Sequence, residues 1–188
     1  ILTSANYPNN IVIGTSTTEF ESDLIFTSVT TPSRIINDVV EHNGMLIAVG
    51  DTIIMSLDDG DTWVQVHNIN SNPKVTFELK SVTHATLTGF TGFVAVGSGQ
   101  ILDATSGITT VVDSNSVFVS TNGYAWTKIN PFSYNAFNSV TSDGTNLVAV
   151  GDNNSIYYSL NGSYWIGITE TSVLGTNGAT NSVSLLSV

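Results

Sequence analysis

The sequence contains no cysteine and very few cationic side chains. The lack of cysteine excludes disulfides, thiolate metal ligands and a cysteine nucleophile. Lysine and arginine together number 4 against 15 acidic residues, which gives a formal net charge of -11. Proteins that neutralise nucleic-acid phosphates or dock on anionic lipid need clustered cations. We therefore predict that neither nucleic acid nor a membrane surface is a direct partner.

Long apolar runs and the common catalytic motifs are also missing. No run approaches the roughly 20 apolar residues that a membrane helix needs. The sequence has no phosphate-binding loop, no dinucleotide fingerprint and no G-x-S-x-G nucleophile elbow. Its three histidines, His42, His67 and His84, do not lie at metal-ligand spacing, and we interpret them as separate surface residues. We predict no cofactor and no metal site.

A repeat organises most of the chain. Each copy contains an apolar strand ending in Ala-Val-Gly, a strand ending in Ser, a polar turn and a tryptophan. The copies span 36–66, 79–129 and 137–168, and the middle copy carries an insertion at about 100–114. Residues 1–35 resemble a degenerate partial copy, and residues 169–188 are predicted to begin a further strand or to form a tail.

Each copy is predicted to form four short antiparallel strands. Its runs of Val, Ile, Phe, Tyr and Thr are separated by Gly, Asn and Asp and show no helical period. Four-stranded units repeated at this spacing are typical of propeller blades. The predicted fold class is all-β, a β-propeller with antiparallel four-stranded blades in a partial ring of about three to four. Open strand edges in such a ring would be covered by other residues or subunits.

The polar turn before each tryptophan has a defined residue pattern. In the first copy Ser56, Asp58, Gly60 and Trp63 fit S-x-D-x-G-x-T-W, and the later copies are shorter and carry Asn in place of Asp. The matching residues of those copies are Ser120, Asn122, Gly123 and Trp126, and Ser159, Asn161, Gly162 and Trp165.

These residue types suit a hairpin turn. Asp or Asn accepts hydrogen bonds from backbone N–H groups, Gly takes a positive φ, and Trp packs its ring beneath the hairpin. We interpret all twelve residues as structural. Ca²⁺ binding by Asp58, Asp59 and Asp61 is the alternative, but the cluster does not match a calcium-binding loop.

The turns resemble the Asp-box (BNR-like) repeats of a β-propeller family that includes sialidases, other glycoside hydrolases and photosystem assembly factors. The resemblance covers about residues 36–168. The shorter S-x-N-G-x-x-W form is similar to degenerate repeats in phage and bacterial structural proteins. Sialidases hold the substrate carboxylate with three arginines, and this chain has only Arg34. The resemblance therefore does not extend to sialidase activity.

The sequence favours a noncatalytic structural or interaction protein on a virion, such as a phage tail, fibre or capsid-associated protein, or on another extracellular surface. Its partners would be other protein subunits of an assembly. The alternative is a carbohydrate-binding or glycoside-cleaving propeller, in which Tyr124, Tyr164 or Phe132 stacks on a surface glycan or Asp38 or Asp143 belongs to a carboxylate pair. An assembly factor is a third hypothesis, but such proteins carry basic patches that this sequence lacks.

Overall fold

All regular structure in the described residues is β-strand. The computed structural model describes residues 10–14, 26–30, 35–70, 75–101, 114–129, 135–153 and 155–168. No helix in these ranges is long and apolar enough to cross a membrane. The strands are β1 (Asn10–Gly14), β2 (Phe26–Thr30), β3 (Ile36–His42), β4 (Met45–Gly50), β5 (Ile53–Ser56), β6 (Val64–His67), β7 (Val75–Leu87), β8 (Phe90–Ile101), β9 (Ser114–Ser120), β10 (Thr127–Ile129), β11 (Phe137–Ser142), β12 (Leu147–Gly151), β13 (Ile156–Ser159) and β14 (Ile166–Ile168).

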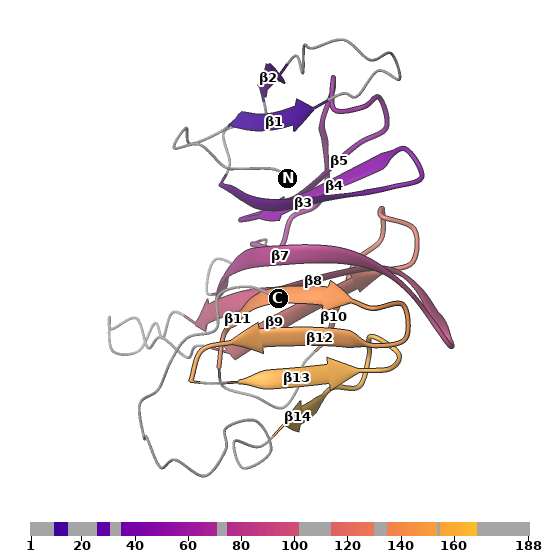
Figure 1. Ribbon diagram of the computed structural model, residues 1–188. Coiled ribbons are helices and arrows are strands. Elements are labelled where there is room, and N and C mark those ends of the chain that lie inside the picture. Colours follow the sequence, from indigo (N-terminus) through magenta and orange to yellow (C-terminus); the bar gives the residue numbers. More distant parts are fainter. Residues whose placement is uncertain are drawn as a thin grey trace.

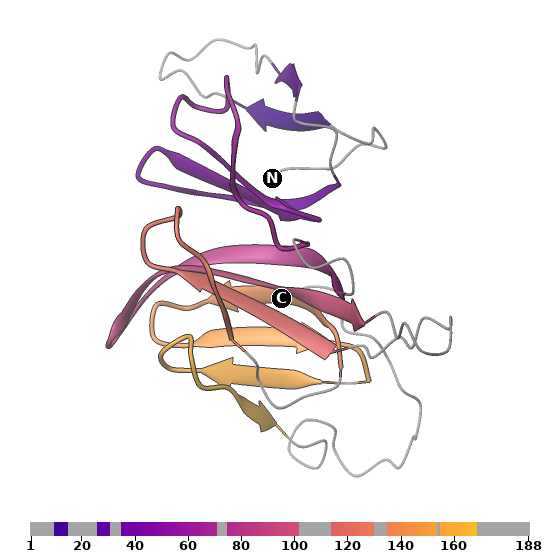
Figure 2. The same ribbon diagram turned by 180° about the vertical axis from the view of Figure 1, so that it is seen from behind.

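The strands form three four-stranded sheets and one two-stranded ribbon (Figure 1). Strands β3 to β6 form blade 1, β7 to β10 form blade 2 and β11 to β14 form blade 3, and in each blade neighbours in sequence pair antiparallel. The reverse view shows the same succession of sheets (Figure 2). The predicted all-β fold with antiparallel four-stranded blades is confirmed.

The borders of the repeat differ from the sequence-based boundaries in blade 2. Strand β7 begins at Val75, four residues before the predicted start at 79, and it pairs with β8 as far as Ile101. Gln100 and Ile101 end β8 and Ser114 begins β9, so the ends of the predicted insertion belong to strands. The β7–β8 hairpin is longer than predicted, since its strands remain paired beyond the Ala-Val-Gly sequence. Residues 102–113 lie outside the described residues.

The two ends of the chain contribute little to the described structure. Within the predicted partial copy at 1–35, β1 and β2 form an antiparallel ribbon from Asn10 to Gly14 and from Phe26 to Thr30. The predicted strand or tail at 169–188 lies outside the described residues.

The glycine of each Ala-Val-Gly sequence faces an irregularity in the first strand of its blade. The register shifts between Ile36 and Asp38 in β3, and the same shift recurs in β7 and β11. A Cβ atom on Gly50, Gly97 or Gly151 would lie 1.8, 2.0 and 2.0 Å, respectively, from a backbone carbonyl oxygen in the first strand or in the residue just before it. Only glycine permits this close approach, which explains why each copy of the repeat has this residue after Ala-Val.

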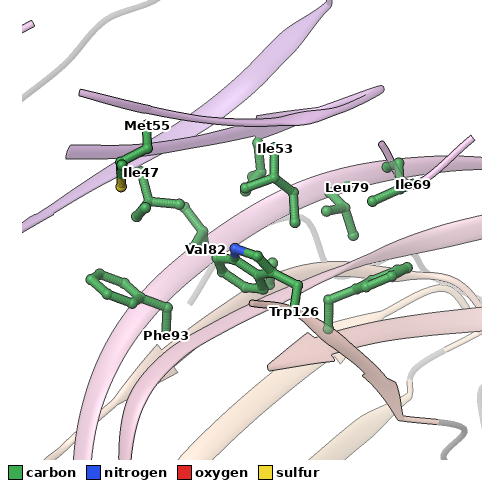
Figure 3. Close-up of a cluster of buried hydrophobic side chains, with 11 residues drawn as sticks. Ile47, Ile53, Met55, Ile69, Leu79, Val82, Phe93 and Trp126 are labelled. Atoms are coloured by element: carbon green, nitrogen blue, oxygen red, sulfur yellow. The ribbon is translucent and has the colours of Figure 1, made fainter. Parts of the chain in front are cut away.

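The core lies between consecutive blades. Ile47, Ile53 and Met55 of blade 1 pack against side chains of blade 2, including Val82 and Trp126, as Figure 3 shows. A second cluster joins the other face of blade 2 to blade 3. Because side chains alternate between faces along a strand, each blade has a first face toward the preceding blade and a second face toward the following one.

Candidate interaction surface

The Ser56 to Trp63 turn of blade 1 is closed by side-chain hydrogen bonds. Gly60 N–H donates to Ser56 Oγ (2.9 Å), and the Ser56 hydroxyl donates to Asp58 Oδ1 (2.7 Å). Thr62 N–H donates to the same Asp58 oxygen (2.9 Å), and Trp63 Nε1–H donates to the Gly60 carbonyl (2.9 Å). The polar groups of the motif therefore bind one another and the local backbone.

The shorter turns of blades 2 and 3 repeat this arrangement with asparagine. Gly123 N–H donates to Ser120 Oγ, and Gly162 N–H donates to Ser159 Oγ, both at 2.9 Å. The Asn122 and Asn161 side-chain oxygens each accept two backbone N–H groups. Gly60, Gly123 and Gly162 have φ angles of 93°, 77° and 72°. The extra residue of the first turn, Asp59, has a φ of 55°.

Hydrogen bonds stabilise the charged form of two carboxylates in hairpin turns. Hydrogen bonds from the Thr62 side chain and backbone, and from Ser56, lower the pKa of Asp58 to about 2. In the β11–β12 hairpin, hydrogen bonds from Thr145 and Asn146 lower the pKa of Asp143 below its ordinary value. Both groups remain ionised at neutral and mildly acidic pH.

The turns also connect neighbouring blades. A Cβ atom on Gly123 would lie 2.4 Å from Met45 Sδ in blade 1, and one on Gly162 would lie 3.4 Å from the Phe90 ring in blade 2. Trp126 belongs to the core cluster between blades 1 and 2, and Trp165 to the cluster between blades 2 and 3. The sequence gives the hairpin geometry of the motif but not this contact with the preceding blade.

Two histidines that the sequence analysis treated as separate surface residues lie together, and that interpretation is wrong for this pair. The His42 and His84 rings stack with centroids 3.3 Å apart and planes 9° apart, and Phe93 meets His84 edge-on at 5.0 Å. Burial, and to a smaller degree His42, lower the pKa of His84. The pair joins β3 of blade 1 to β7 of blade 2.

The hairpin turns of the three blades lie at one end of the sheets (Figures 1 and 2), and several of them carry exposed apolar side chains. Tyr124 of the blade 2 turn and Tyr164 of the blade 3 turn are 50% and 63% exposed, and Leu57 of the blade 1 turn and Leu160 of the blade 3 turn are also exposed. The carboxylates of Glu41, Asp58, Asp61 and Asp143 are at exposed residues of the same hairpin tips and turns. We call this set of four apolar and four acidic residues the turn end. Phe132 lies outside the described residues.

Three of the acidic residues considered for catalysis or metal binding, Asp38, Asp58 and Asp143, accept structural hydrogen bonds. Asp38 accepts hydrogen bonds from Val39 N–H, Val82 N–H and the Ser81 hydroxyl. Asp143 accepts hydrogen bonds from Thr145 and Asn146 in its hairpin. In the part of the chain that the structure describes, no group of three or more His, Cys, Asp or Glu residues is placed to hold a metal ion.

Comparison with known proteins establishes the fold class only. No protein-family model and no curated protein sequence matches the chain. The structure is similar to that of an ancestral GH74 enzyme, with 18% identity and a TM-score of 0.51 over 73% of this chain and 19% of that one. It is also similar to YCF48 bound to D1 peptide, with 15% identity and a TM-score of 0.49 over 90% of this chain and 46% of that one. The chain spans less than half the length of either protein.

Proposed function

We propose that the chain is a noncatalytic interaction module of a β-propeller on a virion or other exterior surface, and that its turn end contacts another protein subunit. The observation that carries this proposal is the exposure of Leu57, Tyr124, Leu160 and Tyr164 on turns whose polar groups are already hydrogen-bonded. The polar residues of these turns hold the hairpins in shape. The apolar side chains beside them are therefore available to a partner.

Two properties of the turn end favour a protein partner. Tyrosine is enriched at protein interfaces because its ring buries much apolar area and its hydroxyl forms hydrogen bonds. Because the backbone of each turn is fixed by side-chain hydrogen bonds, association orders less of the chain and costs less entropy. The exposed carboxylates favour a partner with complementary basic groups at the rim of the contact.

The test uses the assembly isolated from the natural source and reconstituted with variant chains. We expect native mass spectrometry to find the chain within a larger protein complex. Replacing Leu57, Tyr124, Leu160 and Tyr164 together by Ser should release the chain. Ile35 is an exposed apolar residue at the opposite end of blade 1, so Ile35→Ser is the matched control and should leave the complex intact. A monomeric chain that cleaves a glycan would contradict the proposal.

A carbohydrate-binding module is the second candidate, because the exposed rings of Tyr124 and Tyr164 are suited to stacking on sugar faces. A glycan array with the wild-type chain tests this candidate. Binding that disappears in the Tyr124→Ala, Tyr164→Ala double variant, but persists in Ile35→Ser, would favour it over protein association. No glycan binding at millimolar concentration would count against it.

A further inference from the structure

Three Asn-Gly pairs lie in the described residues, and the pair in the β3–β4 hairpin is arranged differently from the other two. Asn43 and Gly44 form the two-residue loop between His42 and Met45, which pair across the hairpin. Both loop residues have positive φ angles, 52° and 76°, as expected for the type I′ turn of a tight hairpin. Both are also exposed, so the pair is in contact with water at the tip of blade 1.

An asparagine followed by glycine is prone to lose its side-chain nitrogen as ammonia. The backbone nitrogen of the glycine attacks the Cγ atom of the asparagine to form a cyclic succinimide, and glycine has no side chain that hinders this approach. The attacking nitrogen must lose a proton and the leaving nitrogen must gain one. A base beside the first nitrogen and an acid beside the second therefore accelerate the reaction.

Two side chains next to the loop contact these two nitrogens. Gly44 N–H donates to Glu41 Oε1 (2.8 Å), so a carboxylate lies beside the attacking nitrogen. Asn43 Nδ2 lies 2.9 Å from His42 Nε2, so an imidazole lies beside the leaving nitrogen. The hairpin thus places a proton acceptor at one reacting atom and, when the imidazole is protonated, a proton donor at the other.

The Asn-Gly pairs in the turns of blades 2 and 3 have a different environment. Gly123 N–H and Gly162 N–H donate to serine hydroxyls (2.9 Å in both turns), which are much weaker bases than a carboxylate. A Cβ atom on these glycines would lie 2.4 Å from Met45 Sδ and 3.4 Å from the Phe90 ring, respectively, so both turns are packed against the preceding blade. A Cβ atom on Gly44 would meet no heavy atom within 4 Å, so the tip of blade 1 has room to rotate during ring closure.

We propose that Asn43 is a site of self-catalysed deamidation, in which Glu41 is the general base and His42 is the general acid. Gly44 N forms a bond to Asn43 Cγ while its proton passes to the Glu41 carboxylate. The bond from Cγ to Nδ2 breaks, and the nitrogen leaves as ammonia with a proton from the His42 imidazolium. One water molecule then opens the succinimide to aspartate or isoaspartate.

The product changes the charge beside the junction between blades 1 and 2. A carboxylate at residue 43 replaces the amide next to His42, whose ring stacks on His84 of β7. Isoaspartate also adds a methylene group to the backbone of the hairpin tip. The inference concerns the covalent chemistry of one hairpin and does not depend on the proposed function.

Peptide mapping by mass spectrometry during incubation of the folded full chain tests the proposal. The incubation is carried out at about pH 6.5, near the ordinary pKa of histidine, where both forms of the imidazole are present. We expect Asn43 to be converted at least about tenfold faster than Asn122 and Asn161. We also expect faster conversion of Asn43 in the folded chain than in the chain unfolded by urea at the same pH, because only the folded hairpin holds both contacts.

Glu41→Gln keeps an acceptor for Gly44 N–H but removes the base, so it should slow the conversion of Asn43 at least about tenfold. Glu78→Gln is the matched control, because it removes the same charge from an exposed residue. Glu78 lies beside Asn37 at the start of β3, whereas Asn43 follows the end of that strand. The control should therefore convert Asn43 at the wild-type rate.

The acid is tested in the same way. His42→Gln should also slow the conversion of Asn43, because glutamine cannot supply a proton to the leaving nitrogen. His67→Gln, in β6, should leave the rate unchanged.

Two outcomes would overturn the proposal. Slower conversion of Asn43 in the folded chain than in the unfolded chain would show that the turn protects the amide, and this comparison needs no variant. An unchanged or faster rate in Glu41→Gln would show that the hydrogen bond to Gly44 only holds the hairpin tip in shape.

Discussion

At the scale of single residues, the three hairpin turns use different side chains to satisfy the same backbone groups. Asp58 accepts a backbone N–H through one carboxylate oxygen and the Thr62 hydroxyl through the other. Asn122 and Asn161 have one acceptor oxygen, and each uses it for two backbone N–H groups. One acceptor oxygen is therefore enough to close the shorter turns. In the first turn the second carboxylate oxygen of Asp58 makes the contribution of this residue to stability depend on pH.

Asp58→Asn should be tolerated much better than Asp58→Ala. The amide keeps the oxygen that accepts Thr62 N–H, whereas alanine removes it and leaves Ser56 without its acceptor. We expect thermal unfolding at neutral pH to show a smaller decrease in melting temperature for Asp58→Asn than for Asp58→Ala, because asparagine loses the charge but keeps the acceptor. Similar decreases in both variants would show that the charge, and not the acceptor, stabilises the turn.

The lowered pKa of Asp58 predicts a loss of stability in acid. The pKa is about 2 in the folded state and 3.8 as the ordinary value, so the unfolded chain takes up the proton first. The stabilisation is present above pH 3.8 and is lost as the pH falls toward 2. Between pH 5 and about 3 the melting temperature of the wild type should fall more steeply than that of Asp58→Asn. Parallel curves would contradict the assignment.

The glycine of each Ala-Val-Gly sequence should be intolerant of even one methyl group. A Cβ atom at residue 151 would lie 2.0 Å from the Ala136 carbonyl oxygen, which belongs to the backbone and cannot rotate away. We expect Gly151→Ala to lower the free energy of unfolding by about 1–3 kcal/mol in urea titration. Gly144 has a φ of 87° and open space around it, so Gly144→Asn is the control and should have a small effect.

At the scale of strands and hairpins, the sequence predicts what is local and misses what is paired across blades. Alternating apolar residues and the Asx-Gly turns predict the strands and hairpins of all three blades, because both signals depend on neighbours in sequence. The stacking of His42 on His84 depends on how β3 and β7 lie side by side. No pattern within either strand indicates that contact. The longer β7–β8 hairpin was missed because Gly97 does not end its strand as Gly50 does.

The His42–His84 contact should make the junction between blades 1 and 2 sensitive to acid. Burial, and next His42, lower the pKa of His84, so the neutral form is favoured in the folded state. Stability is therefore highest above about pH 6.5 and falls as the pH drops below that value, where the unfolded chain binds more protons. Glu41, the exposed residue before His42 in β3, accepts a hydrogen bond from Gly44 N–H through its side-chain carboxylate.

Replacing one ring isolates this effect. His84→Gln removes the titrating group that is stacked between β3 and β7. Between pH 7.5 and 5.5 we expect the melting temperature of the wild type to fall by a few degrees more than that of His84→Gln. His67 also has a pKa lowered by burial and remains in both proteins, so it contributes equally to the two curves. Identical pH dependences would argue against a destabilised imidazole pair.

At the scale of the whole molecule, stability depends on contacts between blades. Both large core clusters contain residues of two consecutive blades, and the tryptophans of blades 2 and 3 pack against the blade before them. A single four-stranded blade cannot bury both of its faces, so the units of such a repeat stabilise one another as nearest neighbours.

The net charge of -11 predicts that salt stabilises the folded chain. Like charges repel one another more strongly in the compact state, and added salt screens this repulsion. Raising NaCl from about 10 mM to about 200 mM at pH 7.5 shortens the screening length from roughly 30 Å to under 10 Å and should raise the melting temperature. At pH 4, where many carboxylates are protonated, the increase should be smaller. A fall in melting temperature with salt at pH 7.5 would indicate that attractive ion pairs dominate.

The backbone N–H of Val82 donates to Asp38 Oδ2, and the backbone N–H of Val140 donates to Ser81 Oγ, so both hydrogen bonds have the same direction along the chain. Every blade that takes part offers a donor to its predecessor and an acceptor to its successor. A duplicated copy of one repeat, inserted beside the original, would meet a suitable neighbour on both sides without any new substitution at the junctions. The number of blades can therefore change by a single tandem duplication in the gene. If each junction used its own pair of matched residues, an added blade would need mutations on both of its faces.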